Sequence, residues 1–350
     1  MEVKALKFGG LTAKRPIVQG GMGVGVSLSS LAGNVAKCGG VGTISGVHPG
    51  YREADFKENP FRANLRAIGN ELEKAKEIAN GGIIGFNFMT VMNHYEEYVK
   101  EAIAAGADFI VSGAGLPVNL AKYAAGTRAA ILPIVSSARA LKLIVKQWQR
   151  AGRLPDAVVV EGPLAGGHLG YPYGHLVDGT FDTLEDSLVD VVDYVRELEE
   201  KNGVKIPVVA GGGVRNYADM ERLMALGASG VQVGTKFVAT EECDAAPAFK
   251  QAYLRSRKED VQLIESPVGL AARAIRNSFL EKVEKQGRIP VQRCYQCMNH
   301  CKQAETKYCI SQALIDAVQG REGLVFCGAN AYEIEKLSTV EKVMQELCGE

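Results

Sequence analysis

The chain has 350 residues, of which 47% are hydrophobic, enough for one large domain or two ordinary ones. Forty basic and forty acidic residues cancel, and this balance argues against nucleic-acid and anionic-membrane partners. The first 18 residues lack the apolar core of a signal peptide, and no apolar run reaches the roughly 18 residues of a membrane span. We therefore expect a cytoplasmic protein whose eight cysteines stay reduced.

Eight short apolar runs are separated by segments with helical periodicity. Near-continuous apolar character is typical of parallel strands that are covered on both faces. The predicted strands are residues 16–20, 41–45, 83–89, 109–112, 130–135, 157–161, 206–210 and 230–233. The predicted helices between them are residues 71–79, 95–105, 138–150, 184–200 and 217–226.

This alternation predicts an α/β protein with a (β/α)8 TIM barrel over residues 1–240. A doubly wound open sheet is the alternative, but its GxGxxG turn is matched only loosely by residues 21–25. Residues 241–350 predict a helical C-terminal extension that carries a four-cysteine site. Its expected helices are residues 245–255, 267–286 and 339–347, and the long connection 48–70 is interpreted as a lid or an insertion.

Glycine-rich turns follow the last two predicted strands. In TIM barrels these two loops commonly bind phosphate, because glycine lets backbone N–H groups approach the anion closely. The turns contain Gly212 and Gly213 after strand seven, and Gly234 and Thr235 after strand eight. One such turn alone would be only a tight connection, but two at these places favour a phosphate-bearing ligand.

Three polar residues lie at the ends of other predicted strands. His168, in the loop AGGHLG, is a candidate general base or hydrogen-bond donor, although a lone loop histidine is more often held by local backbone. Glu161 ends an apolar strand, so it either holds a cofactor hydroxyl or pairs with a core cation. Asn87 suits recognition of a polar ring edge, and capping the next helix is its equally good alternative.

Four cysteines are crowded into the segment RCYQCMNHCKQAETKYC. Cys294, Cys297, Cys301 and Cys309 have the spacing CxxCxxxCx7C, which suits a metal or an iron–sulfur cluster. Because zinc sites more often show two CxxC pairs, an iron–sulfur cluster is preferred, with structural zinc and free thiols as the alternatives. His300 is a substitute ligand candidate.

At this point the sequence resembles the nitronate monooxygenase family, formerly called 2-nitropropane dioxygenases, which includes enoyl-ACP reductase II. The stretches that carry the resemblance are PIVQGGMG, GFN, EGPLAGGHLG, PVVAGGGV, ALGASGVQVGTKFVATEEC and SPVGLAAR. The resemblance implies a TIM barrel that holds non-covalent FMN, usually reduced by NADH or NADPH.

The resemblance also implies roles for residues at matching positions. His168 takes the place of the family's active-site histidine. In nitronate monooxygenases that residue acts as a base or substrate anchor, and in the enoyl reductases it lies beside the flavin and supports reduction of the double bond. The flavin-binding residues that it implies are Gly21, Met22 and Gly23 along the ring, Asn87 at its polar edge, Ser136, then Gly166 and Gly167 beside the ribityl chain, and Gly212, Gly213, Gln232, Gly234 and Thr235 at the phosphate.

The four cysteines depart from this pattern, since ordinary members lack them. Their spacing resembles instead the [4Fe–4S] site of barrel flavoenzymes related to 2,4-dienoyl-CoA reductase. Together these features predict an FMN-dependent NAD(P)H oxidoreductase that reduces an activated, enoyl-type small molecule or acyl thioester with help from an iron–sulfur cluster.

Other functions remain open alternatives at this point. One is a nitronate monooxygenase that oxidises alkyl nitronates with oxygen. Another is a flavin electron carrier or redox sensor whose cysteine segment docks a partner, and a third is a flavin-free barrel that binds a sugar phosphate and structural zinc. A homodimer is compatible with a C-terminal segment that must pack against some surface, whereas the substrate and the choice of nicotinamide cannot be read from the sequence.

Overall fold

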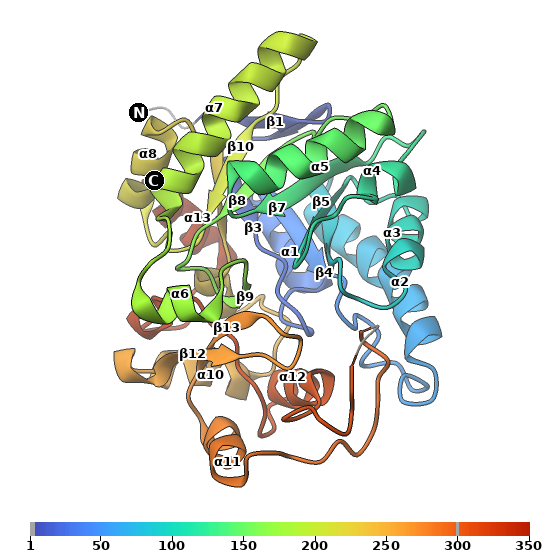
Figure 1. Ribbon diagram of the computed structural model, residues 1–350, viewed down its shortest axis with the longest axis vertical. Coiled ribbons are helices and arrows are strands. Elements are labelled where there is room, and N and C mark those ends of the chain that lie inside the picture. Colours follow the sequence, from blue (N-terminus) through green and yellow to red (C-terminus); the bar gives the residue numbers. More distant parts are fainter. Residues whose placement is uncertain (1–3, 299–300) are drawn as a thin grey trace.

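The computed structural model describes residues 4–298 and 301–350, and its centre is a closed barrel of eight parallel strands (Figure 1). The strands follow one another around the barrel in chain order, and β11 closes it by pairing with β3. They are β3 Ile17–Gln19, β4 Val41–Ser45, β5 Ile83–Met89, β6 Phe109–Gly113, β7 Ala130–Val135, β8 Val158–Glu161, β10 Val208–Gly211 and β11 Gly230–Val233. The predicted TIM barrel is therefore confirmed, and the open sheet is excluded.

The alternation of side chains along each strand separates two apolar layers. Val159 points into the barrel and belongs to the inner core, whereas its neighbours Val158 and Val160 pack against the surrounding helices. The same alternation holds on β10, where Val209 is inside and Val208 is outside. Because both faces of every strand are covered, the strands are apolar almost without interruption.

The hairpin of β1 (Leu6–Phe8) and β2 (Leu11–Ala13) closes one end of the barrel. Leu6 and Phe8 are buried in the inner core, and the Phe8 ring meets the Phe109 ring edge-on with centroids 6.0 Å apart. Phe109 begins its strand, so the hairpin covers the amino ends of the strands. The carboxyl ends, where barrel enzymes bind their ligands, lie at the opposite end beside the C-terminal region.

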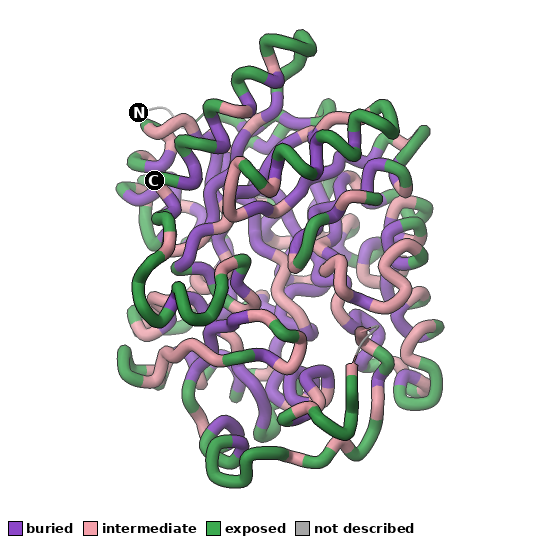
Figure 2. Tube along the Cα trace, in the orientation of Figure 1, coloured by how far each residue is buried: buried purple, intermediate pink, exposed green. Residues whose placement is uncertain are grey.

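Helices surround the barrel and bury one face each (Figure 2). They are α1 Ser29–Lys37, α2 Pro60–Ala79, α3 Tyr95–Ala104, α4 Leu120–Tyr123, α5 Ala138–Arg150, α6 Tyr173–Asp178, α7 Leu184–Asn202, α8 Tyr217–Ala225 and α9 Thr235–Val238. Helix α2 starts earlier than predicted because Pro60 fits the first turn and the Asn59 side chain accepts the N–H of Arg62. The connection interpreted as a lid over residues 48–70 is thus shorter, and its second half is helical.

The C-terminal region contains α10 Pro247–Arg255, β12 Val261–Glu265, β13 Ala271–Ile275, α11 Ser278–Gln286, α12 Ile310–Val318 and α13 Val340–Cys348. The single helix predicted for residues 267–286 is wrong, since β13 occupies its first half. Strand β13 pairs with β12 on one side and with β9 (Gly167–Leu169) on the other. Its alanines favour a helix locally, but pairing on both edges overrides that preference.

Helix α13 returns to the barrel and packs against α1 and α8. It thereby occupies the place in the outer layer that follows β11. The division into a barrel over residues 1–240 and an extension over residues 241–350 stays a prediction. Among the described residues, none of the helices is both long enough and apolar enough to cross a bilayer.

Changing Gly69 to alanine is expected to stabilise the protein. Gly69 lies inside α2, and a Cβ atom built there meets no other atom within 4 Å. Because glycine is less favourable than alanine in a helix interior by about 1 kcal/mol, Gly69→Ala should raise the free energy of unfolding by up to that amount. Urea unfolding followed by circular dichroism measures the change, and a loss of stability would contradict the open environment of this position.

Candidate active site

A cavity of about 470 Å³ lies at the carboxyl ends of the barrel strands, which is within the range of ligand sites in proteins. Its walls bring together almost all the predicted site residues. These are Gly21, Met22, Gly23, Asn87, Glu161, Gly166, Gly167, His168, Gly212, Gly213, Gln232, Gly234 and Thr235. Ser136 lies outside this lining, and its hydroxyl donates to the Gly170 carbonyl at 3.2 Å, so the structure gives its predicted flavin contact no support.

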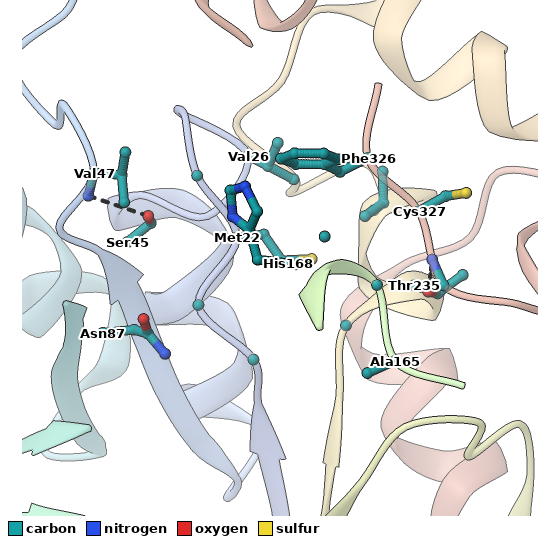
Figure 3. A pocket seen from close by; sticks show the side chains of 18 of the residues that line it. Met22, Val26, Ser45, Val47, Asn87, Ala165, His168, Thr235, Phe326 and Cys327 are labelled. Carbon is teal, nitrogen blue, oxygen red and sulfur yellow. Dashed lines mark hydrogen bonds between the residues drawn. The ribbon is translucent and has the colours of Figure 1, made fainter. Parts of the chain in front are cut away.

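The chain after β3 passes very close to the end of β5. A Cβ atom on Gly21 would lie 2.3 Å from Cβ of Asn87 and 3.3 Å from Cγ2 of Thr43, so only glycine fits there. Figure 3 shows the Asn87 amide on one side of the pocket, with Thr235 and Ala165 on the other. This side of the cavity therefore combines a flat glycine surface with one amide, which can both donate and accept.

The turns after β8 and β10 lie against each other. Gly212 and Gly213 have φ values of +103° and +88°, which strain any other residue. A Cβ atom on Gly166 would lie 2.7 Å from the Cys327 backbone, so this loop is held between the barrel and the C-terminal region. Backbone groups of these turns therefore reach the cavity, where they can donate to a phosphate-bearing ligand.

Arg273 on β13 supports the same loop from behind, and the sequence analysis did not identify it. Its buried guanidinium donates to the Pro163 carbonyl at 3.0 Å and to the Ala165 carbonyl. Because both carbonyls point towards Arg273, the orientation of the peptides that lead to Gly166 and His168 is fixed. The stretch SPVGLAAR, already noted for its resemblance, contains Arg273 and was the available signal.

His168 projects into the cavity from β9, between Met22 and Phe326 in Figure 3. Its Nε2 lies 2.8 Å from the Ser266 hydroxyl, and its ring meets the Phe326 ring edge-on with centroids 5.0 Å apart. Burial lowers the pKa of His168 to about 4. The imidazole is therefore neutral near pH 7, which suits a hydrogen-bond donor or a base rather than a preformed imidazolium.

Glu161 lies at the end of β8, and burial raises the pKa of its carboxyl from 4.5 to about 7. Between these two pH values the unfolded chain ionises while the folded chain does not, so stability falls as the pH rises. Glu161→Gln should therefore stabilise the flavin-free protein at pH 8 by about 2–3 kcal/mol and leave it nearly unchanged at pH 4. Urea unfolding at both pH values tests this, and an equal gain at both would contradict the raised pKa.

The four clustered cysteines, Cys294, Cys297, Cys301 and Cys309, do not line the large cavity as a group. Together they line a small cavity of about 20 Å³ beside it, and of these four only Cys297 contacts both. Among the residues that the structure describes, no three cysteine, histidine or acidic side chains are placed ready to hold a metal. The candidate ligand His300 lies outside the described residues. The iron–sulfur prediction thus gains no support from the arrangement.

Comparison with known proteins places this geometry in context. The family model described as nitronate monooxygenase matches residues 4–350. The chain belongs to the nitronate monooxygenase family. A probable nitronate monooxygenase of Staphylococcus saprophyticus is 26% identical over 309 residues, which are 81% of this chain and 82% of that protein.

Solved structures agree with the barrel of this nitronate monooxygenase family member. FabK from Thermotoga maritima has a TM-score of 0.72 and 23% identity, covering 96% of this chain and 92% of its own. A nitroalkane oxidase from Streptomyces ansochromogenes has a TM-score of 0.65 and 21% identity, covering 96% and 95%. At these identities the likeness shows the fold. Family membership makes the protein an FMN-dependent oxidoreductase.

The cavity of this family member fits FMN on its own evidence. The glycine surface at Gly21 leaves room for a flat ring, and the Asn87 amide faces the position of a polar edge. The strained glycines after β10 and the Gly234–Thr235 turn after β11 border the same cavity, where an anionic tail needs backbone donors. The residues present are therefore those that a flavin nucleotide requires.

Proposed function

We propose that the protein uses FMN and NAD(P)H to reduce an activated, enoyl-type double bond in a small molecule or acyl thioester. The observation that carries this proposal is His168, a neutral, partly buried imidazole that lines the same cavity as the glycine turns and Asn87. When bound, FMN supplies hydride transfer between the nicotinamide and the acceptor. The protein's own residues bind the flavin and the acceptor, orient them towards each other and exclude water from the site.

Each wall of the cavity has a separate task in this proposal. The turns with Gly212, Gly213 and Gly234 hold the phosphate, and Asn87 orients the ring by its polar edge. His168, kept in place by the Ser266 hydroxyl, donates a hydrogen bond to the acceptor's carbonyl oxygen, where negative charge develops during reduction.

The C-terminal region contributes an apolar part to the cavity wall, beside polar residues such as Gln296, Ser311 and Glu333. The apolar side chains are Val268, Ile310, Leu314 and Phe326, and Phe249 lies with them. Such a wall excludes water and accommodates a hydrocarbon chain better than a small polar nitronate. This observation favours an enoyl-type acceptor over an alkyl nitronate as the substrate.

A nitronate monooxygenase is the second candidate function. The family description and the likeness to a nitroalkane oxidase favour it, and the same neutral His168 suits it as a base or anchor. An electron carrier, a cytoplasmic location and a homodimer stay predictions. An iron–sulfur cluster is not needed for this proposal, because a nicotinamide delivers both electrons directly to the flavin.

Two assays on one preparation separate the candidates. FMN released on denaturation should approach one per chain, and NADH or NADPH should bleach the bound flavin without oxygen. A trans-2-enoyl thioester should then restore the colour without oxygen, whereas an alkyl nitronate under air should turn over slowly. Fast nitronate turnover with no enoyl reduction would contradict the proposal, and a protein that neither contains nor takes up FMN would remove both candidates.

A further inference from the structure

Four cysteine residues line a second, much smaller space. Cys294, Cys297, Cys301 and Cys309 all line the cavity of about 20 Å³. A cavity of this size holds roughly one water-sized particle. Four thiols at one small cavity are a ligand set that a single tetrahedral metal ion accepts.

Cys297 stands in the wall between this small cavity and the active-site cavity. The barrel holds its backbone in place, because Asn93 N–H donates to the Cys297 carbonyl at 3.1 Å and Met92 forms a β-bridge with Met298. The Asn93 amide also donates to the Gln296 carbonyl at 2.7 Å. The position of this sulfur is therefore set by the barrel as well as by its own segment.

A chain of hydrogen bonds with one fixed direction leads from Gly50 to the Ser311 hydroxyl, which lines the same cavity as Cys297. Gly50 N–H donates to Asn64 Oδ1 at 3.1 Å, which fixes the amide so that its Nδ2 faces His48 Nδ1 at 3.3 Å. Nδ1 therefore accepts, and the ring proton lies on Nε2, 2.8 Å from the Ser311 hydroxyl oxygen. Ser311 accepts a hydrogen bond from that proton, so its own proton is free to donate towards Cys297, which lines the same cavity.

Donors are also directed at two of the other sulfurs. Gln296 N–H donates to the Cys294 sulfur at 3.3 Å. The backbone N–H groups of Gln312 and Ser311, at the start of α12, are directed at the Cys309 sulfur. Donors at several sulfurs are typical of thiolates bound to a metal, whose outer hydrogen bonds orient the ligands and offset their charge.

From the shared cavity and these donors we propose that Cys294, Cys297, Cys301 and Cys309 bind one soft divalent ion, Zn²⁺, and that Ser311 and His48 position the Cys297 ligand. Zinc bound by four thiolates needs tetrahedral distances of about 2.3 Å, so the sulfurs must close onto the cavity as the ion binds. The bound ion then fastens the cysteine segment to the barrel beside the active-site cavity. This consequence for the active site rests on the proposed function, whereas the metal site does not.

Metal analysis of the whole protein tests the site directly. Purified without chelator, the protein should contain about one zinc and no inorganic sulfide per chain, and Co²⁺ exchanged for zinc should give the spectrum of tetrahedral thiolate coordination. A chain that contains no zinc and takes up none from added Zn²⁺ would overturn the proposal. Iron with an equal amount of sulfide would also overturn it, in favour of a cluster.

Substitutions separate the ligands from the hydrogen-bond chain. Cys297→Ser and Cys294→Ser should each lose the metal, whereas Cys38→Ser, outside the segment, should keep it. Ser311→Ala should weaken zinc affinity by about 10- to 100-fold without abolishing binding. The matched control is Ser187→Ala, a buried serine on α7 that should bind zinc like the unchanged protein. Unchanged affinity in Ser311→Ala would refute the positioning role, and full zinc in Cys297→Ser would refute the ligand set.

FMN content, measured on the same samples, keeps this test apart from the proposed function. Zinc without flavin would support the metal site and contradict the proposed function. Bound flavin and enoyl reduction without any thiolate-bound metal would support the proposed function and contradict the metal site. If both are present, removing zinc with a chelator should weaken FMN or substrate binding, because Cys297 forms part of both walls.

Discussion

His168→Ala is expected to lower turnover by about 100- to 10,000-fold, the usual contribution of a positioned proton donor or acceptor. FMN should remain bound, because the glycine turns and Asn87 are unchanged. The loss should appear in the step that reoxidises the flavin with the acceptor, and reduction by NAD(P)H should change much less. Anaerobic stopped-flow absorbance resolves these two half-reactions.

The control for this variant is His175→Ala. His175 is exposed on α6 and lies outside the cavity lining, so its loss should leave both half-reactions unchanged. Because burial lowers the pKa of His168 to about 4, the rate should show no inflection near pH 6.5 from this residue. Equal turnover in His168→Ala and His175→Ala would remove His168 from the mechanism.

Gly21→Ala is expected to weaken FMN binding by about 10- to 100-fold. The added Cβ atom would lie 2.3 Å from Cβ of Asn87, so either the loop or the strand must move. Overpacking of this kind costs about 1–3 kcal/mol, and each 1.4 kcal/mol changes an affinity tenfold. Both partners line the cavity, so the displacement falls on the flavin site. Titration of the flavin-free protein with FMN, followed by fluorescence quenching, measures the affinity.

Gly69→Ala serves as the matched control, since it adds the same methyl group in open space on α2. It should leave FMN affinity unchanged while raising stability slightly. If Gly21→Ala binds FMN as tightly as Gly69→Ala does, then the close approach of the two chain segments does not shape the flavin site. Near-ultraviolet circular dichroism would verify that both variants keep their folded cores.

The barrel could be predicted because its strands are buried on both faces. Continuous apolar runs such as those of β5 and β7 are typical of parallel strands covered on both faces, and their predicted bounds agree with the structure. The region after the barrel was harder, because the sequence AARAI of β13 has the composition of a helix. Only its pairing with β9 and β12, distant in sequence, makes it a strand.

The candidate site was predictable where residues follow strands directly. Asn87, Glu161 and Gly212 all stand at strand ends, where any TIM barrel presents its ligand-binding groups. Residues that the C-terminal region brings to the cavity, such as Phe326 and Ser311, carried no signal of their own. Their positions depend on how that region folds back over the barrel, which periodicity does not encode.

The packing of α13 against α1 and α8 has a consequence for synthesis of the protein. The outer layer next to β11 stays open until residues 340–348 have emerged from the ribosome. Until then the apolar surfaces that α13 covers face water and chaperones. A nonsense mutation shortly before Val340 would leave every strand and every candidate site residue in place, and yet should yield a chain that aggregates.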